Sequence, residues 1–168
     1  MACILEAATG KRYADLVSER LWKPLGAEQN AGITVDVSGF TLASGGMFTS
    51  LRDAARIGQL ILNKGRVGRA QVIPETWIND FLTQPGDGKL LPLGGESVAP
   101  YYRSFIWGIG DGKGTVLARG VHGQFIYISP STGVVIAMYS TWPNADGGAP
   151  RVGFNNALKL LESIKNSI

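Results

Sequence analysis

The sequence predicts an α+β fold, in which a helical segment is followed by an antiparallel sheet of three to four strands covered by a C-terminal helix. Two patterns lead to this prediction. Apolar residues recur at helical spacing in the first half of the chain, whereas from Tyr101 onward short apolar runs alternate with turn residues. The 168 residues, 45% hydrophobic and 17% charged, suit one folded domain over 1–168. Residues 1–100 are expected to be mainly helix and loop, and 101–168 to hold the strands and the final helix.

Four helices are predicted in the first half, over residues 2–9, 12–22, 50–64 and 74–81. Gly10 is a good C-cap for the first helix, and Pro24 with Gly26 is expected to end the second. Ser50 and Asp53 have the spacing of a capping box, with Asp in place of the usual Glu. Residues 26–49 lack a sustained period, and residues 83–100 are rich in Gly and Pro, so both stretches are predicted to be loops.

The second half predicts an antiparallel meander. Its strands are expected at Tyr102–Ile109, Thr115–Gly120, Gln124–Ser129 and Val134–Thr141. The last of these is apolar on both faces, which indicates a strand covered on both sides. An amphipathic helix over Gly153–Lys165 is expected to lie on the sheet.

The composition excludes several function classes. The net charge of +3 comes from Lys and Arg scattered along the chain, without the clustered patch typical of nucleic-acid binding. The single cysteine, Cys3, allows no internal disulfide and is expected to be a small buried residue. One histidine, His122, and one cysteine far from it do not make a zinc site. No segment approaches the ~18 apolar residues of a membrane span.

Motifs that carry a nucleophile are absent from the sequence. It contains no Ser-x-x-Lys, Gly-x-Ser-x-Gly, Tyr-x-Asn or Ser-x-Asn. One histidine is enough for a Ser-His-Asp triad, but no serine stands in a motif that would activate and expose it. Ser44-Gly45-Gly46 fits a structural turn better than a nucleophile. The residues alone therefore argue weakly against self-contained catalysis.

Four stretches, in this order and spacing, carry a family resemblance. They are ILEAATGKRYADLVSERLWKPLGAE (4–28), ASGGMFTSLRDAARIGQLILNKGR (43–66), QVIPETWINDF (71–81) and GVHGQFIYISPSTGVVIAMYSTWP (120–143). Together they resemble the carboxyl-terminal half of the serine β-lactamase and DD-peptidase superfamily, nearest to the class C-like esterases and 6-aminohexanoate-dimer hydrolases.

The resemblance implies amide or ester hydrolysis through an acyl-enzyme, without a cofactor or metal. In the family, a serine and lysine in Ser-x-x-Lys and a tyrosine in Tyr-x-Asn act on the substrate, and both motifs lie upstream of the matching region. This chain is thus expected to hold no catalytic residue. The family's Lys-Thr-Gly strand motif falls on His122, Gly123 and Gln124, which the resemblance makes substrate-binding residues, with a backbone N–H near Gln124 as an oxyanion donor.

Three functions follow as hypotheses. The chain is a serine hydrolase fragment that is inactive alone, a small-molecule-binding or protein-interaction module derived from that fold, or an enzyme built in an unfamiliar way around His122. Because the family pairs the final strand with amino-terminal strands that this chain lacks, its apolar edge is predicted to recruit another chain. The expected partner is a second copy, giving a homodimer or higher oligomer, or the missing amino-terminal half.

Overall fold

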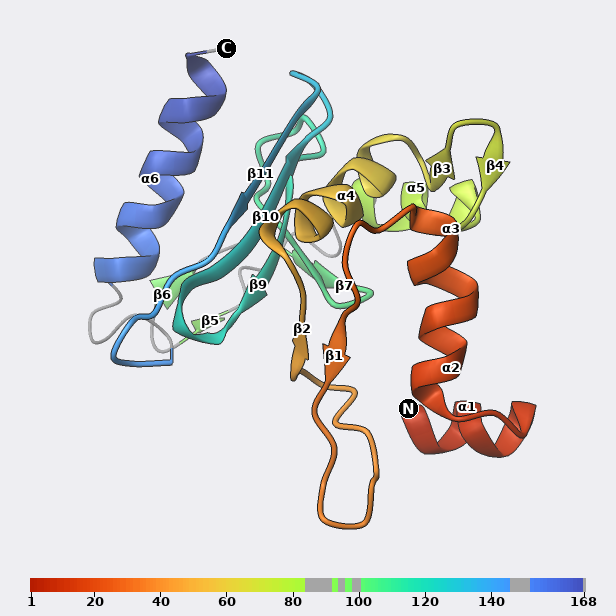
Figure 1. Ribbon diagram of the computed structural model, residues 1–168. Helices are drawn as coiled ribbons and strands as arrows, with labels where there is room; N and C mark the ends of the chain where they lie inside the picture. The colour runs from red at the N-terminus through yellow and green to blue at the C-terminus, as the bar shows by residue number, and fades with distance from the viewer. Residues whose placement is uncertain (84–91, 94–95, 98–100, 146–151, 168) are drawn as a thin grey trace.

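A computed structural model describes residues 1–83, 92–93, 96–97, 101–145 and 152–167. The helices and the sheet fall in the predicted order (Figure 1). Helix α4 lies on one face of the central sheet and α6 on the other, while α1 to α3 lie beyond α4. The α+β prediction is confirmed. No helix within the described ranges is long and apolar enough to cross a membrane.

The amino-terminal helices follow the predicted boundaries with one exception. Helix α1, Ala2–Thr9, ends at Gly10, whose left-handed φ of 67° is easy for glycine. The second run comprises α2 (Tyr13–Val17), a π-helical segment (Ser18–Trp22) and α3 (Lys23–Leu25), and Gly26 caps it. Pro24 was predicted to help end this run, but it lies inside it, in the first turn of α3. The backbone hydrogen bonds change there from the π-helical to the α-helical spacing, so proline, which has no N–H, is tolerated.

Cys3 was predicted to be buried, and this is wrong. Only Ala2 is buried among the residues of α1, and Cys3 is exposed and unpaired. Helix α1 lies at the edge of the molecule, so most of its apolar residues face away from the core (Figure 1). The apolar composition of the segment was therefore a poor guide to burial.

A two-stranded hairpin and helix α4 follow. Strands β1 (Gly32–Ile33) and β2 (Met47–Phe48) pair within the predicted loop. Ser44-Gly45-Gly46 lies in the connecting turn, and the Gly46 carbonyl accepts bonds from the Thr34 N–H and hydroxyl at 2.9 Å. Helix α4, Leu51–Leu62, begins at Ser50, whose Oγ accepts from the Asp53 N–H at 3.1 Å, as the capping pattern predicts.

Helix α4 rests on strands β10 (Gln124–Ser129) and β11 (Val134–Met138). A Cβ on Gly58 would lie 2.5 Å from a methyl carbon of Val135 and 2.8 Å from one of Ile126. Glycine at position 58 therefore sets how closely the helix approaches the sheet. Helix α5, Glu75–Thr83, follows the small hairpin of β3 (Arg66–Val67) and β4 (Ala70–Gln71).

Most of the predicted loop over 83–100 lies outside the described residues. Within it, β5 (Pro92–Leu93) and β6 (Glu96–Ser97) pair as a short hairpin.

The central sheet has five strands rather than three to four. Its order is β11-β10-β9-β8-β7, with every neighbouring pair antiparallel, and β9 spans Val116–Gly120. The extra strand arises because the predicted strand at 102–109 is a hairpin of β7 (Tyr101–Arg103) and β8 (Ile106–Gly108). The turn residues Ser104 and Phe105 both have left-handed φ, 51° and 67°. Such turns favour Asn and Gly, so the Ser-Phe pair gave no turn signal.

Two apolar clusters fill the two faces of the sheet. On the α4 and α5 side, the buried members are Ile61, Ile78, Phe81, Ile106, Val116 and Ile128. On the other side, α6 (Val152–Asn166) contributes Ala157 and Leu161, which pack with Leu117, Phe125 and Tyr127. The Tyr127 hydroxyl also donates to Glu162, which pairs with Lys165. Burial, together with this carboxylate, raises the pKa of Tyr127.

Candidate functional site

His122 lies in the turn between β9 and β10, in the short helical segment Val121–Gly123. Its φ of 58° is left-handed, and its backbone bonds to the segment that follows β11. The His122 N–H donates to the Ala145 carbonyl at 2.7 Å, and the His122 carbonyl accepts from the Trp142 N–H at 3.1 Å. The residue thus belongs to a fixed turn rather than to a strand.

The His122 ring has one nitrogen tied to the backbone. Nδ1 lies 2.8 Å from the Trp142 carbonyl oxygen. Because a carbonyl oxygen can only accept, Nδ1 carries the proton, and in the neutral ring Nε2 is the unprotonated nitrogen. On this exposed residue, Nε2 can accept a hydrogen bond from a ligand.

Gly123 and Gln124 hold the turn against the same segment. Gly123 is buried at φ 85°, and a Cβ there would lie 2.6 Å from the Trp142 ring. The Gln124 Nε2 donates to the Ser140 carbonyl at 2.6 Å and to the His122 carbonyl at 3.2 Å. Both residues therefore stabilise the turn as well as flanking His122. Gln124 is the first residue of β10, as the sequence predicts.

A hollow of about 240 Å³ lies next to this turn. Its lining residues are Phe105, Ala118, Arg119, Gly120, Gln124, Phe125, Ile126 and Tyr139. Ala118 and Ile126 also pack against the α4-side cluster, so the hollow is on that face of the sheet. Its volume is below the ~300 Å³ of a typical ligand pocket.

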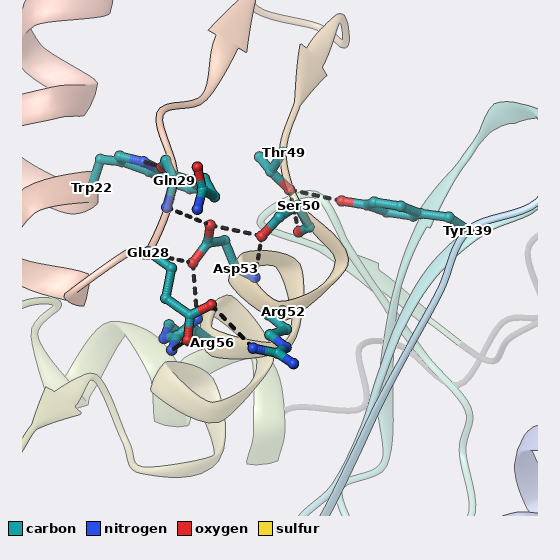
Figure 2. Close-up of polar contacts among 9 residues, drawn as sticks. All are labelled: Trp22, Glu28, Gln29, Thr49, Ser50, Arg52, Asp53, Arg56 and Tyr139. Atoms are coloured by element: carbon teal, nitrogen blue, oxygen red, sulfur yellow. Dashed lines mark hydrogen bonds and ion pairs between the residues drawn. The ribbon is translucent and has the colours of Figure 1, made fainter.

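Tyr139 lines the hollow, and its hydroxyl lies beside the start of α4. It lies 2.7 Å from the Thr49 hydroxyl, one residue before the helix cap (Figure 2). Sequence reasoning did not select Tyr139, Thr49 or Phe105. The sequence did contain one signal for the hollow. Ala118 and Gly120 alternate along β9, and two small residues on one face of a strand leave space there.

A buried carboxylate lies at the other side of the α4 start. Asp53 is fully buried and accepts from the Glu28 N–H at 2.8 Å, the Gln29 N–H at 3.1 Å, the Ser50 hydroxyl at 2.7 Å and Arg56 Nη1 at 3.0 Å (Figure 2). The Glu28 N–H is the main cause that lowers the pKa of Asp53. A carboxylate held ionised in this way is a poor general base, so the Ser50–Asp53 pair fixes a loop rather than activating a hydroxyl.

A second cavity, of about 560 Å³, lies at the opposite strand ends. Two of its charged side chains, Lys64 and Asp111, already have partners. Lys64 pairs with Glu75 at 3.3 Å, and the Asp111 carboxylate accepts from the Lys113 N–H at 2.8 Å and from Thr115. Across the described ranges, no cluster of three or more His, Cys, Asp or Glu side chains could hold a metal ion.

Comparison with known proteins places this architecture in a family. The β-lactamase family model matches residues 1–160. Over 149 residues, the chain is 36% identical to the 6-aminohexanoate-dimer hydrolase of Paenarthrobacter ureafaciens. This match covers 87% of the chain but 38% of the relative.

Solved structures give the same result. A Bacillus anthracis protein described as a 6-aminohexanoate-dimer hydrolase superposes with a TM-score of 0.81 at 30% identity. The superposition covers 98% of this chain and 42% of the Bacillus chain. A Bacteroides dorei protein described as a β-lactamase gives 0.65 at 21% identity, covering 98% and 55%, which supports the fold alone. The chain spans less than two thirds of each of these relatives. It belongs to the serine β-lactamase superfamily.

Proposed function

We propose that this chain is part of a serine hydrolase that cleaves amide or ester bonds. The chain would form one side of the substrate site, and the nucleophile would lie on polypeptide outside it. One observation carries the proposal. Nearly the whole chain superposes on 42% of a hydrolase-like structure, yet its sequence holds neither Ser-x-x-Lys nor Tyr-x-Asn. The name of the Paenarthrobacter relative points to amides of the 6-aminohexanoate type as the substrate class.

The side-chain contacts support this proposal. Acyl transfer needs a hydroxyl or thiol within hydrogen-bond reach of a base. Ser50 bonds to the buried Asp53, Ser129 Oγ accepts from Thr132, and His122 Nδ1 faces a backbone carbonyl. None of these contacts joins a serine to His122.

In the assembled enzyme, the turn at His122 would form one side of the substrate site. The backbone of this turn is fixed by hydrogen bonds to residues 142 and 145. A backbone N–H of the turn that points at a developing oxyanion would therefore already be in place before the reaction. The neighbouring hollow, with Phe105, Ile126 and Tyr139, would hold an apolar arm of the substrate.

The proposal predicts that the purified chain hydrolyses N-acetyl amides and the linear 6-aminohexanoate dimer no faster than buffer. His122→Ala should leave both rates unchanged, because the His122 ring is bonded to a backbone carbonyl rather than to a serine. Product release is measured by chromatography, with a full-length 6-aminohexanoate-dimer hydrolase as the positive control. Steady turnover that His122→Ala abolishes would contradict the proposal and establish an enzyme built around His122.

A binding module is the second candidate function, favoured by the hollow and by the exposed His122 ring, whose Nδ1 is bonded to the Trp142 carbonyl. It predicts a small molecule that binds the isolated chain reproducibly and is weakened by His122→Ala. Calorimetric titration with 6-aminohexanoate separates the two candidates. This compound is the product that hydrolysis of a 6-aminohexanoate dimer would give.

A further inference from the structure

The cavity of about 560 Å³ lies at the strand ends opposite to His122, and the proposed hydrolase function does not use it. The end of α5, the β8–β9 turn over 109–115 and the first residue of β7, Tyr101, contribute to its walls. Small-molecule sites typically have volumes of about 300–1,000 Å³ and an apolar lining with a few polar groups that orient the ligand. The cavity has this size, so the groups that line it decide what it could bind.

The walls of the cavity are held together by contacts that need no ligand. The Tyr101 hydroxyl donates to the Phe81 carbonyl at 3.0 Å, which ties β7 to the end of α5. Gly114 has a left-handed φ of 74°, and a Cβ there would lie 3.3 Å from the Leu82 carbonyl oxygen and 3.9 Å from a ring carbon of Pro130. The β8–β9 turn therefore lies directly against α5, and the cavity between them is already formed.

Three apolar side chains line the cavity. Leu82 packs against the buried cluster on the α4 and α5 side of the sheet, and Tyr101 is only 6% exposed. Because the Tyr101 hydroxyl is bonded to the Phe81 carbonyl, the ring is the part of Tyr101 that a ligand can contact. Pro130, which follows β10, is the third. We refer to Leu82, Tyr101 and Pro130 as the apolar floor, which suits the uncharged body of a ligand.

Most polar side chains of the cavity already have partners. The Thr83 hydroxyl donates to the Asn79 backbone carbonyl, and the Thr115 hydroxyl donates to the Asp111 carboxylate. The same carboxylate accepts the N–H of Lys113 at 2.8 Å and the N–H of Thr115 at 3.3 Å. These three donors offset the negative charge of Asp111, so the carboxylate stabilises its own turn and is not left to bind a cation.

Two polar side chains of the cavity remain without a partner in the part of the chain that the structure describes. They are the Lys113 ammonium, on the exposed β8–β9 turn, and the Asn79 amide, half-buried on α5. Both can donate hydrogen bonds. Lys64 adds a second positive charge at the cavity, although it is paired with Glu75. The unpaired charge is therefore positive, and it calls for an anionic ligand.

We propose that this cavity binds a small carboxylate with an apolar body. The carboxylate oxygens accept hydrogen bonds from Lys113 Nζ and Asn79 Nδ2, while the apolar body covers the apolar floor. An inorganic anion would satisfy Lys113 but would leave the floor exposed to water. The site lies at the other end of the sheet from His122, so it does not depend on the proposed hydrolase function.

Benzoate is the probe, titrated into the full 168-residue chain and followed by calorimetry and by amide chemical shifts. We expect a dissociation constant of about 1 mM or tighter. The shifts should be concentrated in residues 79–83 and 110–115. Benzamide has the same shape without the charge and should bind about tenfold more weakly. Inorganic phosphate, which lacks an apolar body, should also bind more weakly than benzoate.

Matched variants test the two donors. Lys113→Ala and Asn79→Leu should each weaken benzoate binding about tenfold, because each removes a hydrogen bond to a charged group. Lys113→Ala should leave benzamide binding unchanged, and Lys113→Arg should restore benzoate binding. Lys159→Ala is the control, since Lys159 is an exposed lysine of α6 outside the cavity. Lys113 is exposed, so the thermal midpoint of Lys113→Ala should equal that of the parent chain.

Three results would overturn the inference: no saturable shifts at the cavity, benzamide binding as tightly as benzoate, or benzoate binding that Lys113→Ala does not weaken. Shifts confined to the turn at His122 would also overturn it, and they would favour the binding-module function instead. Fluorophosphonate labelling reports separately on whether the chain holds a nucleophile. The failure of this inference and the failure of the proposed hydrolase function are therefore distinguishable.

Discussion

Asp53→Ala is expected to lower the thermal midpoint of the chain by roughly 10 °C. The carboxylate is fully buried and accepts four hydrogen bonds, from the N–H groups of Glu28 and Gln29, from Ser50 and from Arg56. Removing it leaves four part-buried donors without this acceptor, and Arg56 keeps only its ion pair with Glu28. Thermal unfolding followed by circular dichroism measures the effect.

Asp36→Ala is the matched control. Asp36 also accepts two backbone N–H bonds, from Ser38 and Phe40 at 2.8 Å, but it is exposed in the loop between β1 and β2. Water can replace those bonds, so its midpoint should change by only about 2 °C. Equal effects of the two substitutions would show that burial of Asp53 is not what stabilises the loop over 28–29 on α4.

The same carboxylate gives a pH dependence with a defined sign. The pKa of Asp53 is lowered in the folded chain, chiefly by the Glu28 N–H, so its ionised form favours folding. That stabilisation is complete well above about pH 3.9, the pKa of an unfolded aspartate, and it is lost as the pH falls through the lower folded-state value. Asp53→Asn should flatten this part of the stability profile.

Leu161→Ala should cost about 2–5 kcal/mol in the free energy of unfolding. Leu161 is fully buried and packs between α6 and the sheet, beside Phe125 and Tyr127. The truncation leaves a cavity between the helix and the strands. Urea unfolding followed by tryptophan fluorescence reports it, because Trp107 and Trp142 pack against the same cluster.

The neighbouring residue supplies the comparison. Leu160 has the same side chain one position earlier but is half exposed, so Leu160→Ala should change stability by about 0.5 kcal/mol or less. A large loss from Leu160→Ala, or none from Leu161→Ala, would mean that α6 presents a different face to the sheet.

Local signals in the sequence predicted most of the fold. Gly10 and Ser50 mark helix ends by cap geometry that the structure shows, and the strands predicted at 124–129 and 134–141 are observed as β10 and β11. The errors arise where tertiary contacts override local preference. Pro24 lies within a helix that a π-helical segment precedes, and Ser104-Phe105 adopts a turn that usually requires Asn or Gly.

The candidate site was only partly predictable. Resemblance selected His122, Gly123 and Gln124, and the structure shows that they form a turn bonded to residues 140–145. The hollow needed the structure, because Phe105, Tyr139 and Thr49 are far apart in the sequence and meet only when β2 and β7–β8 are placed against β11. No local pattern specifies such a convergence.

Intact mass spectrometry after treatment with a fluorophosphonate tests the central claim most directly. The account predicts that the folded, isolated chain keeps its unmodified mass, while a full-length 6-aminohexanoate-dimer hydrolase in the same reaction gains one adduct. A single stoichiometric adduct on a serine of the isolated chain, lost when the chain is first denatured, would contradict the account and place a working nucleophile within these 168 residues.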